Sequence, residues 1–236
     1  MINNLQKIIN KIIDKSYKKN QKMSIRMRYK KMSEGFEEIM LFMDKHYQNE
    51  SKEYYTKRSK QDKKLTSIQK TAFNEIKKCI DVSLCNKNIK YELIPASSFS
   101  AKTNLINESD IDFAILVHNI NEDKAICFSN ALGNCKYILT DIRNPQNIKR
   151  KHWVFQKYIN KVEIEGKVRD YKGFYEMLKM HQYTDNKMSK KEKILTTYTK
   201  YLLKKYAKKE YEKFKMIYYC NAGYHGKSKE LLYPLL

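Results

Sequence analysis

Residues 97–116 read SSFSAKTNLINESDIDFAIL and place two aspartates, Asp110 and Asp112, one residue apart in an otherwise apolar run. Successive side chains of a β-strand point to opposite faces, so the two aspartates share a face while Ile111 and Phe113 face a core. Two neighbouring carboxylates repel each other unless a cation lies between them. Mg²⁺ prefers such carboxylates together with water and phosphate oxygens. The pattern predicts a divalent metal site, although alternating acids are also common on a strand with one solvated face.

Composition favours a helical protein with a packed core. The chain has 236 residues, of which 42% are hydrophobic, with only 6 glycines and 3 prolines. This length allows one large domain or two small ones. The scarcity of turn residues argues against an all-β sandwich, which needs many tight turns.

The net charge of +22 is unevenly distributed along the chain. Basic and acidic side chains number 20 and 9 in residues 1–80, 13 and 11 in residues 81–170, and 15 and 6 in residues 171–236. A nearly neutral middle between cationic flanks suits a site that handles phosphate. A lysine-rich composition that decorates every solvated helix explains the overall charge equally well.

Hydrophobic periodicity predicts helices, then a small sheet, then helices. In the first third, helices are expected over residues 3–15, 33–47 (with Ser33 as N-cap) and 65–85, with a loop or exposed helix end over 48–64. Strands are expected in IKYELIPASS (89–98), DIDFAILV (110–117) and KYILTDI (136–142), and a hairpin turning near Asn160-Lys161 in HWVFQKYINKVEIEGKVRD (152–170). Helices follow over 172–182, 190–208 and 209–219. Residues 121–133 are ambiguous, and SKELLYPLL (228–236) is a short helix or a docked extension.

These elements predict an α+β fold in which a small mixed sheet is flanked by helices. We expect an N-terminal helical region over residues 1–86 and a sheet-containing core over 87–171. A C-terminal helical region over 172–236 is expected to pack on that core.

Small hydroxyl residues lie between the first predicted strand and the aspartates. Ser97 and Ser98 follow the strand, and Lys102, Thr103 and Asn104 come next. Hydroxyl groups and free backbone N–H groups at a helix start suit a triphosphate.

This arrangement resembles the signature of the DNA polymerase β-like nucleotidyltransferase superfamily, clearly over residues 88–118 and more weakly to 170. Members carry Gly-Ser, a short helix, often Gly-Thr, and then Ser-Asp-h-Asp, where h is apolar. These motifs fall on Ser97-Ser98, Lys102-Thr103 and Ser109-Asp110-Ile111-Asp112. Both glycines are replaced here, by Ser97 and Lys102. The stretch is most similar to poly(A) polymerases, notably the catalytic subunits of large DNA viruses.

The family also needs a third carboxylate on a later strand, and KVEIEGKVRD offers two. Glu163 and Glu165 point to the same side, so periodicity does not choose between them. We favour Glu163 because Val-Glu-Ile encloses it in apolar residues, as in the similar strand of the alarmone synthetases. Asp170 lies on the opposite face and is a weaker candidate. Alternatively, these acids form the solvated face of an edge strand.

The resemblance implies a template-independent nucleotidyltransferase that adds AMP from ATP to an RNA 3′ end. The implied catalytic residues are Asp110, Asp112, Glu163 and Glu165, with Mg²⁺ or Mn²⁺ held by Asp110, Asp112 and Glu163. The implied nucleotide-binding residues are Ser97, Ser98, Lys102, Thr103, Asn104 and Ser109. Two alternatives stay open: transfer to a protein or small-molecule acceptor, and a degenerate domain that serves as an RNA-binding or structural subunit beside a protein partner.

A basic cluster in the last third is a candidate RNA contact. It consists of Lys204, Lys205, Lys208 and Lys209. Tyrosines at 198, 201, 206 and 211 lie beside it at near-helical spacing, where they could stack on bases or pack against a neighbouring helix.

The remaining features concern the compartment. Five cysteines without CxxC spacing predict free thiols in a reducing compartment, and so a cytoplasmic protein. The resemblance to enzymes of large DNA viruses implies that this compartment is the host cytoplasm or a virion. No apolar run reaches 18 residues, so no membrane span is expected. The basic, amphipathic N-terminus is typical of an organellar transit segment, but Asp14 and the lack of arginine favour a plain first helix.

Overall fold

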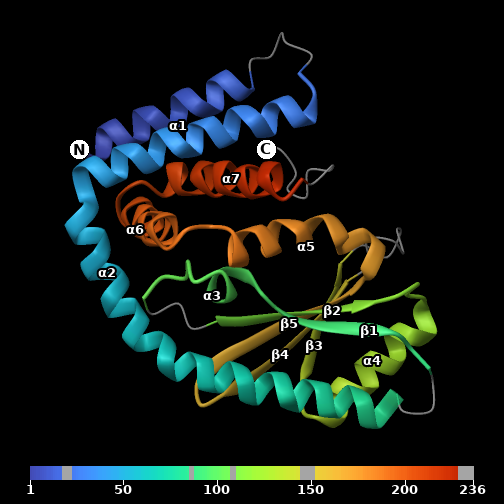
Figure 1. The fold of residues 1–236 in the computed structure, drawn as a ribbon. Helices are drawn as coiled ribbons and strands as arrows, with labels where there is room; N and C mark the ends of the chain where they lie inside the picture. Colours follow the sequence, from blue (N-terminus) through green and yellow to red (C-terminus); the bar gives the residue numbers. More distant parts are fainter. Residues whose placement is uncertain (18–22, 85–87, 107–109, 144–151, 228–236) are drawn as a thin grey trace. The chain divides into compact units, whose positions relative to one another are not determined.

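A computed structural model describes residues 1–17, 23–84, 88–106, 110–143 and 152–227 (Figure 1). Within these residues the fold is a mixed α+β arrangement with helices flanking one sheet. In chain order the elements are α1 (Ile2–Ser16), α2 (Ile25–Leu84), β1 (Tyr91–Ala96), α3 (Ser97–Ser100), β2 (Asp110–Val117), α4 (Glu122–Asn134), β3 (Ile138–Arg143), β4 (His152–Ile159), β5 (Val162–Asp170), α5 (Tyr171–Asn186), α6 (Lys190–Tyr206) and α7 (Lys208–His225).

The elements group into two compact units. Unit 1 comprises Met1–Arg58, Ala101–Leu105 and Glu176–Leu236, and unit 2 comprises Ser59–Ser100 and Ile106–Tyr175. This grouping differs from the three consecutive regions expected from sequence. The second half of α2 belongs with the sheet, whereas helices from the two ends of the chain share one unit.

Unit 1 is held together by an apolar core between N-terminal and C-terminal helices. Leu5 and Ile9 of α1 and Phe36 of α2 are buried in it. The Phe36 ring stacks on Phe214 of α7, with ring centroids 6.3 Å apart. The stripe predicted over residues 3–15 therefore forms the buried face of α1.

One expectation about α2 is wrong. Ser33 is not an N-cap, because α2 begins at Ile25 and Ser33 lies buried inside it, where its hydroxyl donates to Asn221 Oδ1 (2.8 Å). Residues 48–64 are helical, in line with the helical one of the two expected alternatives, but they lie within α2 and not at its end. Lys57 and Glu53 form an i,i+4 ion pair of 2.7 Å there, which supports a helix that has no apolar stripe. Tyr47 has non-helical dihedral angles (φ −142°, ψ 23°) and marks a kink between two helical segments.

Unit 2 contains a five-stranded mixed sheet in the order β1-β2-β5-β4-β3. Strands β2 and β5 are parallel, and the other neighbours are antiparallel. The β4–β5 hairpin turns at Asn160 and Lys161, whose φ values of 51° and 66° suit a two-residue turn that matches the twist of the strands. The turn predicted at these residues is confirmed.

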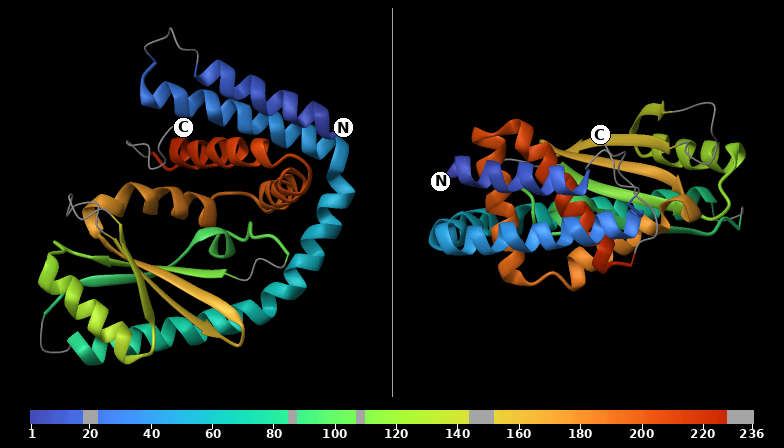
Figure 2. Two further views of the ribbon diagram at one scale, coloured as in Figure 1. Left: turned by 180° about the vertical axis from the view of Figure 1, so that it is seen from behind. Right: turned by 90° about the horizontal axis from the view of Figure 1, so that it is seen from above.

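One face of the sheet is covered by α4 and by the part of α2 that belongs to unit 2 (Figures 1 and 2). Ile111 and Phe113 of β2 and Ile164 of β5 are buried in this core. Phe128 of α4 and Ile76 of α2 pack against them. The apolar residues that alternate with the predicted acids therefore face helices.

A disulfide joins Cys79 of α2 to Cys135 at the end of α4. The expectation of five free thiols is therefore wrong for these two, because the two helices approach each other over the sheet. Cys127 and Cys220 carry free thiols. Cys85, like the tail over 228–236, lies outside the described residues. None of the described helices combines the length and the apolar character needed to cross a bilayer.

Candidate functional site

The parallel register of β2 and β5 brings the predicted acids together. Asp110 pairs with Glu163, and Asp112 pairs with Glu165, at the start of both strands. Ile111 and Ile164 pair between them and are fully buried on the helix-covered face. The described acids, Asp112, Glu163 and Glu165, are half-buried and belong to the other face. The structure describes the backbone of Asp110 but not its side chain.

Strand β1 brings the predicted serines to the same end of the sheet. Its last residue, Ala96, pairs with Asp112, and α3 begins at the next residue. Helix α3 is a single turn that packs against β2. Phe99 anchors it in the core of unit 2, while Ser98 is half-buried. The side chain of Ser97 and the whole of Ser109 lie outside the described residues.

The two glutamates have different partners. Glu163 accepts a hydrogen bond from the neutral side-chain amide of Gln156 on β4. Glu165 pairs with the ammonium group of Lys167, with Nζ 3.2 Å from Oε1. The Gln156 amide leaves the charge of Glu163 in place, whereas Lys167 offsets the charge of Glu165. Periodicity could not separate the two acids, but their partners do.

Asp170 lies far from these acids. It pairs with Val117 at the opposite end of the same two strands. It lies five positions after Glu165 along β5, roughly 16 Å at the rise of a β-strand. Asp170 Oδ1 instead accepts a hydrogen bond from the backbone N–H of Ile120 (3.4 Å).

The segment after α3 belongs to unit 1. Lys102 is exposed and has a φ of 55°, the left-handed conformation that glycine adopts without strain. Thr103 is buried, and Lys200 Nζ lies 3.1 Å from its Oγ1. Asn104 is also buried and accepts a hydrogen bond from Arg58 Nη1 (3.0 Å). Thr103 and Asn104 thus have partners within unit 1, and their contact with a nucleotide stays a prediction.

The four lysines of the basic cluster, Lys204, Lys205, Lys208 and Lys209, are exposed in unit 1. Tyr198 and Tyr201 pack against α2, where Tyr54 stacks on Tyr201 with centroids 4.5 Å apart. Tyr206 is exposed, and Lys205 Nζ lies 4.9 Å from its ring centroid. Helix packing therefore accounts for the first two tyrosines but not for Tyr206.

Two exposed apolar residues beside the acids were missed from sequence. Tyr158 of β4 pairs with Glu163, and Ile138 of β3 pairs with Gln156. Their side chains are 63% and 66% exposed. For Tyr158 the signal was present in the hairpin, because a two-residue turn at Asn160-Lys161 fixes which residues of β4 and β5 face each other. The place of Ile138 depends on the pairing of β3 with β4, which the hairpin does not set.

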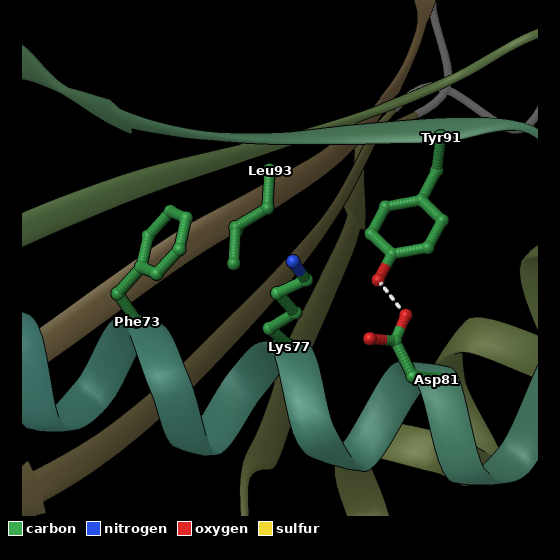
Figure 3. A pocket seen from close by; sticks show the side chains of 5 residues that line it. All are labelled: Phe73, Lys77, Asp81, Tyr91 and Leu93. Atoms are coloured by element: carbon green, nitrogen blue, oxygen red, sulfur yellow. Dashed lines mark hydrogen bonds between the residues drawn. The ribbon is translucent and has the colours of Figure 1, made fainter.

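A small cavity of about 320 Å³ lies elsewhere in unit 2, between α2 and β1 (Figure 3). Phe73, Lys77, Asp81, Tyr91 and Leu93 line it. Figure 3 shows the Tyr91 hydroxyl directed at the Asp81 carboxylate, with which it forms a hydrogen bond. Burial and this hydrogen bond raise the pKa of Tyr91 well above its usual range. The cavity lies on the helix-covered side of the sheet and is separate from the acids.

Comparisons with protein-family models, curated protein sequences and solved structures found no match to the chain. Among the side chains that the structure describes, no three His, Cys, Asp or Glu residues form a group that could hold a metal. The Asp110 side chain is not among those searched.

Proposed function

We propose that the chain is a metal-dependent nucleotidyltransferase that adds AMP from ATP to the 3′ end of an RNA. The observation that carries this proposal is the register of the parallel strands, which pairs Asp110 with Glu163 and Asp112 with Glu165. The placement of α3 directly after the strand that pairs with Asp112 adds to it. A third supporting observation is the positive φ of Lys102, because the nucleotidyltransferase signature often has glycine at this position.

The chemistry of the donor set suits Mg²⁺ or Mn²⁺, although the described side chains by themselves do not form a group that could hold a metal. Asp112, Glu163 and Glu165 offer carboxylate oxygens, the ligand type that these hard cations take. Asp110, Asp112 and Glu163 would hold the metal ions. When bound, such ions offset the charge of the reacting phosphate and of the leaving pyrophosphate.

The remaining roles in the transfer reaction fall to residues of the chain itself. Lys167 pairs with Glu165, so it holds a positive charge beside the carboxylates and leaves the carboxylate of Glu163 available to a metal ion. Ser98 follows the strand next to Asp112, and its hydroxyl would donate a hydrogen bond to an oxygen of the β- or γ-phosphate. The acceptor 3′-oxygen forms a bond to the α-phosphorus while the bond to the bridging oxygen breaks. The proton of the acceptor hydroxyl passes to a carboxylate of this set.

The experiment is extension of a 5′-labelled RNA by purified protein with ATP and Mg²⁺ or Mn²⁺. Asp112→Asn and Glu163→Gln should each reduce extension by about 100-fold or more, since each removes a charge that would hold the metal. Glu92→Gln is the matched control. Glu92 is an exposed acid on the same sheet, but it pairs with Leu116, four residues along β2 from Asp112. Failure of the wild-type protein to extend RNA while it binds ATP would refute the proposal.

One observation favours a second candidate, a non-catalytic domain that serves as an RNA-binding or structural subunit. Lys167 supplies an internal cation to the acidic face, and such a cation can offset a carboxylate without any metal. In that case Lys167→Met should lower stability and leave the protein inactive. In a metal site the same change removes a competing charge, so it should tighten Mn²⁺ binding, measured by titration calorimetry.

A further inference from the structure

Unit 2 presents one more feature on the face that carries the acids, an exposed apolar surface formed by Tyr158 and Ile138, here named the shelf. The alternation of β4 assigns it to this face. Phe155 and Ile159 pack into the core under the helices. Gln156 bonds Glu163 on the other side, and Tyr158 follows Gln156 by two residues.

The two side chains of the shelf are more exposed to solvent than is usual for large apolar residues of a strand. Tyr158 and Ile138 are among the most exposed large apolar side chains in the described part of unit 2. Strand residues at a sheet end ordinarily carry polar groups when they face water. Here Tyr158 pairs with Glu163, and Ile138 lies one strand further from the carboxylates, so an exposed apolar surface adjoins the acids.

The order of the strands at this end of the sheet shows on which side of the acids the shelf lies. From β1 to β3, the register gives Ser97 and Ser98 after β1, then the acids on β2 and β5, then Tyr158 on β4, then Ile138 on β3. Strand β4 lies two strand spacings from β2, about 10 Å. The serines and the shelf therefore flank the acids on opposite sides.

Phosphoryl transfer places the attacking and leaving oxygens roughly in line across the phosphorus. If the triphosphate lies toward Ser98, the attacking hydroxyl approaches from the side of β4. We propose that the shelf binds the 3′-terminal nucleobase of the acceptor strand, with the base stacked on Tyr158 and its edge against Ile138. The assignment of the acceptor rests on the proposed function, whereas the apolar surface itself does not.

A direct binding assay tests the shelf without catalysis. A 5′-fluorescein-labelled RNA of five adenylates is titrated with the full chain in EDTA and without ATP, and its anisotropy is measured. Stacking of one base on an aromatic side chain changes affinity by about 5- to 150-fold on alanine substitution. Tyr158→Ala should raise Kd within that range, and Tyr158→Phe, which keeps the ring, should stay within about twofold of wild type.

Ile138→Ala and Ile126→Ala form a matched pair. Ile126 is an isoleucine of α4 that is 52% exposed, and α4 covers the opposite face of the sheet. Ile138→Ala should weaken binding, and Ile126→Ala should not. Equal Kd values for Tyr158→Ala and wild type, or equal losses for the two isoleucine variants, would overturn the proposal.

Steady-state kinetics separate the shelf from the transfer reaction. In an active enzyme Tyr158→Ala should raise KM for the RNA primer about tenfold and leave KM for ATP unchanged. A rise in KM for ATP alone would place the incoming base on the shelf and overturn the assignment. If the wild-type protein extends no RNA but Tyr158→Ala still weakens oligonucleotide binding, the proposed function fails and the shelf stands. If the wild-type protein extends RNA but Tyr158→Ala leaves Kd and KM unchanged, the proposed function stands and the shelf fails.

Discussion

Gly166 directly follows Glu165, and the substitution Gly166→Ala adds one carbon atom to the core beneath the acidic face. Gly166 pairs with Phe155 across β5 and β4, and a Cβ built on it would overlap the end of the Phe155 ring, closest to Cζ. Phe155 is fully buried and meets Tyr137 edge-on, with centroids 5.5 Å apart, so the ring has no open space to enter. Overpacking of this kind costs about 1–3 kcal/mol. The lower chain entropy of unfolded alanine returns roughly 0.4–1 kcal/mol, so we expect Gly166→Ala to lower the free energy of unfolding by about 1–2 kcal/mol.

Urea unfolding followed by tryptophan fluorescence measures this change. Trp153 is the only tryptophan of the chain and belongs to β4, so its emission reports on unit 2. Gly133→Ala is the control, because a Cβ at Gly133 meets no atom within 4 Å. It should leave stability unchanged or raise it by up to about 1 kcal/mol. In a Phe155→Leu background the cost of Gly166→Ala should fall by at least about 1 kcal/mol. An unchanged cost in that background would refute the reasoning.

Three further predictions concern other parts of the fold. Lys102→Gly should be more stable than Lys102→Val by about 1–2 kcal/mol, because only glycine adopts the left-handed conformation at φ 55° without strain; equal urea midpoints would contradict this. Reduction of the Cys79–Cys135 disulfide, which joins residues 56 apart, should lower the free energy of unfolding of unit 2 by about 4 kcal/mol on the loop-entropy relation. A urea midpoint insensitive to reductant would exclude the bond in solution. Burial raises the pKa of the Cys220 thiol to about 12, so only about one in 10⁴ molecules carries the thiolate at pH 8. Iodoacetamide should label Cys220 only in urea, as read by peptide mass spectrometry, and labelling of native protein at pH 8 would contradict the burial.

Local patterns predicted most of the secondary structure. Strand β2 begins and ends where DIDFAILV does, a short apolar run in which Asp112 lies half-buried between the buried Ile111 and Phe113 and every residue from Ala114 to Val117 is buried. The hairpin turn was visible because asparagine tolerates positive φ. Helix α2 was not predicted as one element, since residues 48–64 lack an apolar stripe. Ser33 resembled a cap, but its hydroxyl is satisfied by Asn221, 188 residues away, which no local pattern encodes.

The candidate site was predictable in part, because the alternation of side chains along a strand shows which residues share a face. Alternation placed Asp110 with Asp112, and Glu163 with Glu165, on common faces. It did not predict that β5 lies next to β2, a parallel pairing between two strands that are separated along the chain by α4, β3 and β4. The partners that distinguish the two glutamates, Gln156 and Lys167, depend on that pairing. Sequence spacing likewise gave no sign of the Cys79–Cys135 bond.

Unit 1 is built from segments at both ends of the chain, so it can be completed during synthesis only after unit 2. Unit 2 is complete once Tyr175 has been made, but the core around Phe36 needs Phe214 of α7. At 5–20 residues per second, roughly 10–30 s separate the synthesis of Arg58 from that of His225. During this time α1 and the start of α2 have the apolar face that includes Leu5 and Ile9 without its C-terminal partner. A ribosome that stalls before α7 therefore leaves a nascent chain that contains all of unit 2 and an apolar N-terminal helix face whose C-terminal partner has not been made, a form open to chaperones and to aggregation.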